Sequence, residues 1–149
     1  MAVTLMAMCD AISDTLATAT GIESTKGFDE ITTAIPADQC PRIQVYTDSI
    51  GPAPDAGQTS QATFNMSVQP LDIPIFVDLY ARKRSWIWLD MEAMLTSANA
   101  LVDVIQAQRK PYFGMSYIQS FSWTFKRGVM QYGKSMYMGG RFIITARVF

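Results

Sequence analysis

Two stretches of alternating side chains near the end of the sequence constrain the fold more than any other feature. Large residues recur at every second position in 117–125 and again in 142–148. The first stretch carries Phe121, Trp123 and Phe125. Period-two alternation is typical of strands with one buried face. The sequence therefore predicts that two strands of one sheet close the chain.

The segment between these strands, Lys126 to Gly140, has an unusual composition. It contains three methionines, two tyrosines and four glycines, and we expect it to form a loop. Flexible thioethers suit a surface that must accommodate a partner, although the loop could instead fold back on its own sheet. The residues expected to contribute to a subunit or partner contact are Met130, Tyr132, Lys134, Met136 and Tyr137.

Apolar periodicity also assigns the elements that precede this segment. Spacings of three and four predict helices at 3–19 and 89–108, with Met91 and Met94 in the core. Alternation predicts three further strands, which cover residues 42–47, 61–69 and 75–80. The second and third of these strands are expected to pair as a hairpin or to lie as close neighbours.

This order of elements predicts an α+β fold with two layers. A mostly antiparallel sheet of four or five strands would carry both helices on one face. The chain has 149 residues, which fits a single domain covering 1–149. Prolines and glycines predict an exposed loop at 48–61 and a turn at 70–74. No segment approaches the roughly 18 uninterrupted apolar residues that a membrane span needs, and the sequence predicts a soluble protein.

Groups that could perform chemistry are few. The sequence has no histidine, the usual base of a nucleophilic triad. Asp72 and Asp78 lie on one face of a predicted strand, and a carboxylate enzyme is one hypothesis for them. We favour a solvated edge carboxylate and a turn cap, and expect no catalytic, cofactor or metal site. Cys9 and Cys40 are expected to be free thiols, although a disulfide stays open.

A basic cluster precedes the second helix. Arg82, Lys83 and Arg84 are followed by Trp86 and Trp88, and such a pattern can bind single-stranded nucleic acid through charge and stacking. The net charge of −1 provides no global attraction for nucleic acid. We favour the interpretation that the basic triplet is the solvated end of a strand and that the tryptophans pack between sheet and helix.

Three segments carry a resemblance to a known family. They are Cys40–Tyr46 (CPRIQVY), Ile75–Arg82 (IFVDLYAR) and the closing Tyr137–Val148 (YMGGRFIITARV). Together with the amphipathic first helix and the Ala/Leu-rich second one, they make the chain similar to tail terminator (tail completion) proteins of long-tailed bacteriophages. More loosely, the chain resembles the neck, or head-tail joining, proteins of these phages. The likeness spans almost the whole chain and rests on element order, length and the closing strand.

The resemblance implies a structural virion protein without an active site. Such a protein forms a homo-oligomeric ring, typically a hexamer, that caps the tail tube and joins the tail to the head through the neck. Its partners would be the tail tube protein and a neck or head-completion protein, and DNA would pass through its bore without sequence readout. It would be made in the host cytoplasm. The residues Arg82, Lys83 and Arg84 join the 130–137 set as candidate contact residues.

Overall fold

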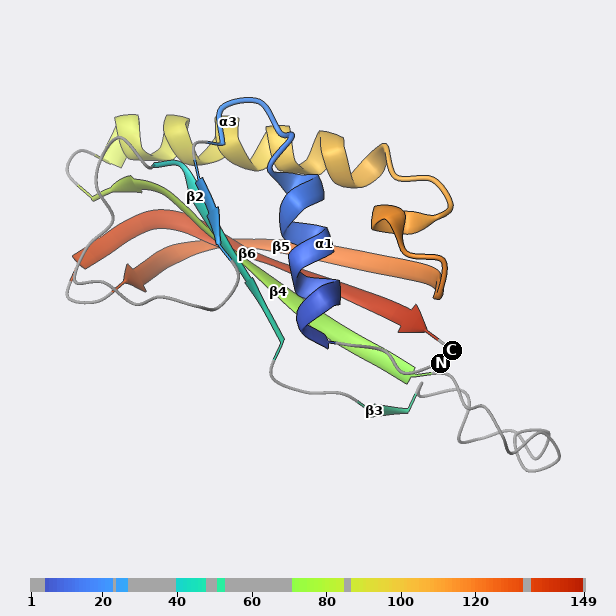
Figure 1. Cartoon of the computed structure of the whole chain (residues 1–149). Coiled ribbons are helices and arrows are strands. Elements are labelled where there is room, and N and C mark those ends of the chain that lie inside the picture. The colour runs from blue at the N-terminus through green and yellow to red at the C-terminus, as the bar shows by residue number, and fades with distance from the viewer. Residues whose placement is uncertain are drawn as a thin grey trace, which may run out of the picture.

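Two helices pack on one face of a twisted sheet in the computed structural model of the chain (Figure 1). The structure describes residues 5–22, 24–26, 40–47, 51–52, 71–84, 87–132 and 135–148. The elements in chain order are α1 (Leu5–Leu16), β1 (Ser24–Lys26), β2 (Arg42–Tyr46), β3 (Gly51–Pro52), β4 (Leu71–Lys83), α3 (Ile87–Gln106), the 3-10 helix η3 (Tyr112–Gly114), β5 (Ile118–Tyr132) and β6 (Ser135–Val148).

The sheet confirms the predicted α+β class and its mostly antiparallel character. Among the described residues it has six strands in the order β1-β2-β4-β6-β5, with the short β3 paired to the start of β4. The β1–β2 pair is parallel and the remaining pairs are antiparallel. The strands that flank α3 in sequence, β4 and β5, are not neighbours, because β6 lies between them.

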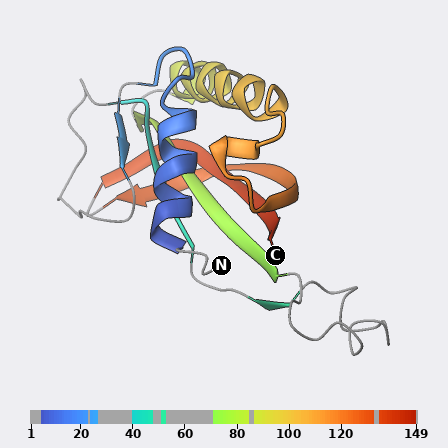
Figure 2. The same cartoon turned by 45° about the vertical axis from the view of Figure 1, so that its right-hand side comes forward.

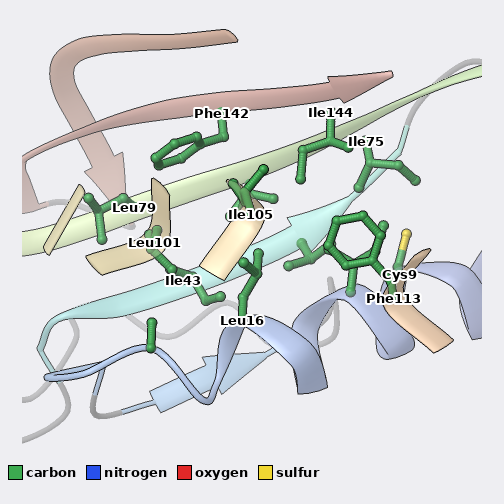
Figure 3. Close-up of a cluster of buried hydrophobic side chains, with 14 of the residues drawn as sticks. Cys9, Leu16, Ile43, Ile75, Leu79, Leu101, Ile105, Phe113, Phe142 and Ile144 are labelled. Atoms are coloured by element: carbon green, nitrogen blue, oxygen red, sulfur yellow. The ribbon is translucent and has the colours of Figure 1, made fainter. Parts of the chain in front are cut away.

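Both helices contribute to a single apolar core on one side of the sheet. In the two cartoon views α1 lies in front of the strands and α3 runs above them (Figure 1, Figure 2). The predicted stripe of the first helix is correct, since Cys9, Ile12 and Leu16 are fully buried. Figure 3 shows these helices meeting the sheet, where Leu101 and Ile105 of α3 face the same cluster. Neither Cys9 nor Cys40 forms a disulfide.

Strand β4 begins earlier than predicted and passes through the expected turn at 70–74. Pro74 lies inside the strand, opposite Thr145 of β6. Its carbonyl oxygen accepts a hydrogen bond from the Thr47 hydroxyl at 2.7 Å, on the side of β2. Because N–H and C=O of one strand residue point the same way, the proline nitrogen also faces that side, where β2 has ended at Tyr46. The proline therefore removes no hydrogen bond from the β4–β6 ladder.

The expectation of a loop at 126–140 is wrong. Both closing strands continue through this segment, so that pairing reaches from Ile118 and Val148 to Tyr132 and Ser135. Gly128 lies opposite Gly139, and the glycines that suggested a loop are therefore ladder residues. Most of the predicted loop at 48–61 and the predicted strand at 61–69 lie outside the described residues.

Candidate functional site

The structure brings the two sets of candidate contact residues to one end of the sheet, which we call the hairpin end. Strand β4 finishes there beside β6, so Lys83 lies opposite Tyr137. Tyr137 in turn lies opposite Met130 of β5. The backbone N–H of Arg84 donates to the carbonyl oxygen of Met136 at 3.0 Å. Residues that lie about fifty positions apart in sequence therefore form one continuous surface.

Two of the predicted contact residues are buried within the hairpin end. Tyr132 and Tyr137 flank Tyr80 of β4 in edge-to-face contacts, with ring centroids 5.3 and 5.9 Å from that of Tyr80. All three rings are buried, and burial raises the pKa of the Tyr80 hydroxyl, with a smaller contribution from the charge of Asp78. Met136 is exposed and Met130 is half-buried. Lys134 lies outside the described residues.

Arg42 is a buried cation at the hairpin end. Its side chain packs against the tyrosine cluster, with the guanidinium carbon 5.2 Å from the centroid of the Tyr132 ring. The residue is 4% exposed, and its Nε and Nη2 atoms have no hydrogen-bond partner among the described residues. Arg42 lies opposite Tyr80 in the β2–β4 register. In the alternation of β2, Arg42 falls on the strand face opposite Ile43 and Val45. This alternation is the sequence pattern that could have placed Arg42 beside Tyr80 and Tyr132.

A groove of about 1150 Å³ lies on the helix side of the hairpin end. Arg82, Lys83 and Arg84 all line it, with Leu89 and Ala93 of α3 on its opposite side. Arg82 reaches the buried carboxylate of Asp90, with 3.4 Å between Nε and Oδ1. Lys83 and Arg84 are exposed, as the sequence predicted for the end of a strand.

Trp88 contradicts the prediction that the tryptophans pack between sheet and helix. Its side chain is 73% exposed, and Trp86 lies outside the described residues. Helical spacing places Trp88 on the same side of α3 as Met91 and Leu95, and Leu95 is 57% exposed. The Arg127 guanidinium of β5 contacts the Met91 sulfur at 3.3 Å. This side of α3 therefore faces β5.

An apolar surface results, which we call the α3–β5 flank. The residues that form it are Trp88, Met91, Leu95, Phe125, Arg127, Val129 and Met136. Strands β4 and β6 lie beneath α3, whereas β5 is the outer strand of the sheet and is only partly covered. Four of the large exposed apolar side chains of the described residues belong to this one flank, namely those of Trp88, Leu95, Val129 and Met136. Scattered exposed apolar residues are common, but their gathering marks a contact surface.

The two candidate carboxylates share one face of β4, as predicted. This face lies opposite the helices, and each carboxylate is paired with an arginine of β6. Asp78 lies 2.8 Å from the Nε of Arg141, and Asp72 lies 3.0 Å from the Nε of Arg147. Their strand, β4, lies inside the sheet, so the expectation of an edge carboxylate is wrong. Within the described ranges no group of three His, Cys, Asp or Glu residues could hold a metal ion.

The comparisons with known proteins bring no family assignment. No family model matches the sequence, and no curated protein matches it. In the part of the chain that the structure describes, none of the helices combines the length and apolar character needed to cross a membrane.

Proposed function

We propose that this chain is a structural subunit that assembles with copies of itself into a ring of the tail-terminator type. In this role the ring, which we expect to be a hexamer, caps the tail tube of a long-tailed phage and joins it to the neck. The protein acts by shape and contact and carries out no catalysis. Its location is the virion.

The α3–β5 flank is the observation that carries this proposal. Burying exposed apolar surface contributes about 25 cal/mol per Å², and a tryptophan left 73% exposed beside Leu95 forgoes much of this gain in a solitary chain. A subunit that meets its neighbours through this flank recovers it. The two-layer fold and its closing strands also agree with the resemblance in the sequence.

The hairpin end is the part of the molecule suited to meet a different ring. It carries the ends of β4, β5 and β6, and it presents Lys83 and Arg84 to solvent. Two exposed cations can meet an acidic surface on a protein of another composition. We assign this end to contact with the tail tube or with the neck protein.

Electron microscopy of the purified protein mixed with phage tail tubes tests the function. We expect ring-shaped density at one end of each tube and tubes of uniform length. Tubes that remain uncapped, or that grow at the same rate with and without the protein, would contradict the proposal. A ring found at the head vertex instead would favour the alternative role of a neck or head-completion component.

A second candidate function is the binding of single-stranded nucleic acid. The observation that favours it is the exposure of Trp88 close in sequence to the exposed Lys83 and Arg84, since base stacking needs an accessible ring. Titration of the protein with fluorescent oligonucleotides at low salt tests it. Binding that weakens steeply with salt and is lost in Trp88→Ala would support this function, and a flat titration would remove it.

A further inference from the structure

We infer that the α3–β5 flank of one subunit receives helix α1 of the next copy of this chain. This inference rests on the proposed ring and names the two surfaces that would form it. The occupant is the outward stripe of α1, which consists of Met6, Asp10 and Asp14. The contact is heterologous, because each subunit offers its α1 on one side and its flank on another.

The outward stripe of α1 follows from the helical spacing. Met6, Asp10 and Asp14 are spaced four residues apart and all are exposed, opposite the buried positions Ile12 and Leu16. Met6 is 56% exposed, and it is the large apolar side chain that α1 leaves in solvent. The stripe thus combines one flexible apolar anchor with two carboxylates, neither of which forms an ion pair with a described residue.

The flank offers the complementary chemistry. Leu95 and Val129 provide apolar surface for a methionine, and Met6 can adapt to the space between them. Arg127 is exposed within the flank, and among the described residues its side chain contacts the Met91 sulfur and forms no ion pair. One cation on the flank and two carboxylates on α1 give the match of opposite charges that orients two surfaces during association.

The arrangement of the layers explains why a second copy fits. Helix α1 packs on β2 and α3 packs on β4 and β6, so the helix layer covers the sheet from one edge and stops before β5. The groove lined by Thr20, Thr96 and Val104 shows that the other side of α3 already faces the segment that follows α1 in the same chain, and α1 itself also contacts α3. An incoming α1 would continue the helix layer over β5. Because the two contacting surfaces differ, the same contact repeats from subunit to subunit and can close a ring.

A charge exchange between the two surfaces tests the inference. One variant carries Asp10→Lys and Asp14→Lys, and the other carries Arg127→Asp. We expect each variant alone to self-associate at least about tenfold more weakly than wild type, since like charges now face each other. An equimolar mixture of the two should recover the association, because opposite charges meet again at both kinds of contact. Sedimentation velocity over a concentration series provides the measurement.

Matched substitutions on other exposed positions serve as controls. Asp103→Lys and Lys110→Asp also reverse the charge of an exposed side chain, but neither residue belongs to the flank or to the outward stripe of α1. Both variants should sediment like wild type. Circular dichroism and thermal melting establish that every variant folds.

The outcomes separate this inference from the proposed function. Wild-type protein that stays monomeric at every concentration overturns the inference, and so do variants that associate as strongly as wild type or a mixture that fails to recover. If wild type forms rings on tail tubes and the variants do so equally well, the function stands and the subunits meet elsewhere. If the charge exchange behaves as expected and no ring appears on tubes, the contact stands and the function fails.

Discussion

Arg141 of β6 lies across the sheet from Asp78 of β4 and holds its buried carboxylate, with Nε 2.8 Å from Oδ1. The hydroxyl of Tyr46 on β2 donates to the same carboxylate at 2.9 Å, so three neighbouring strands share one polar contact. The hydrogen bond that Arg141 donates to Asp78 raises the pKa of the Arg141 guanidinium, which stays charged. The Asp78 carboxylate, which suggested an enzyme, therefore links β4 to the strands on either side of it.

Removal of either partner should destabilise the sheet. We expect Asp78→Ala to lower the free energy of unfolding by about 2 kcal/mol, and Arg141→Ala by about 3 kcal/mol, because the latter leaves a buried carboxylate without its cation. The double variant should cost less than the sum of the two. Urea denaturation measures all three. The pair Asp72–Arg147, whose carboxylate is more exposed than that of Asp78, is the control, and Asp72→Ala should cost about 0.5–1 kcal/mol. Equal losses at both pairs would contradict this role of Asp78.

Gly139 and Gly128 face each other in the ladder but differ in what surrounds them. A Cβ at Gly139 would overlap the carbonyl oxygen of Leu79, whereas a Cβ at Gly128 would meet nothing within 4 Å. We therefore expect Gly139→Ala to cost about 3 kcal/mol or more, because backbone atoms must move. Gly128→Ala should be neutral or slightly stabilising. Thermal melting of the two variants decides, and similar melting temperatures would show that the strands do not approach as described.

Arg42 is a buried cation in the tyrosine cluster, and two of its nitrogens have no hydrogen-bond partner in the part of the chain that the structure describes. Methionine fills a similar volume without the cost of burying a cation, so we expect Arg42→Met to raise the free energy of unfolding by about 1–3 kcal/mol. Chemical denaturation in urea measures the change. A loss of stability would mean that the guanidinium is better satisfied than the described contacts allow. Lys110→Met, at an exposed position, is the control and should change little.

Cys9 makes the fold sensitive to alkaline pH. Burial, followed by the charge of Asp10, raises the pKa of its thiol from 9.0 to about 11. Above pH 9 the unfolded chain loses this proton while the folded chain keeps it, so the unfolded state binds fewer protons and stability falls. This loss should reach about 2 kcal/mol by pH 11, and it becomes negligible about one pH unit below pH 9. Urea denaturation along this pH range should show a smaller decline in Cys9→Ala; an identical decline would contradict the assignment.

The sequence predicted those elements whose pattern is set by one buried face. The spacing of Cys9, Ile12 and Leu16 located α1, and the alternation around Phe142 located β6. The extent of the hairpin was missed because it depends on pairing. Gly128 weakens a strand when considered alone, but opposite Gly139 it belongs to a regular ladder.

The candidate surfaces were only partly predictable. The residue types of the hairpin end were identified, yet burial of Tyr137 depends on Tyr80, a contact between strands that no local pattern reveals. Trp88 was expected to pack between sheet and helix because tryptophan side chains are highly buried on average. It lies outside because its helix presents Met94 and Leu101 to the core instead. The direction of a helix face relative to the sheet edge is a property of the packed structure.

Sedimentation velocity of wild type beside Leu95→Glu tests whether subunits meet through the α3–β5 flank. Leu95 lies in the α3–β5 flank and is exposed, so a glutamate there is tolerated by the fold and removes apolar contact area from the interface. Leu89→Glu, at an exposed leucine on the opposite side of the same helix, is the matched control. We expect a discrete larger species for wild type and for Leu89→Glu, and we expect Leu95→Glu to lose it. Identical sedimentation of all three proteins would contradict it.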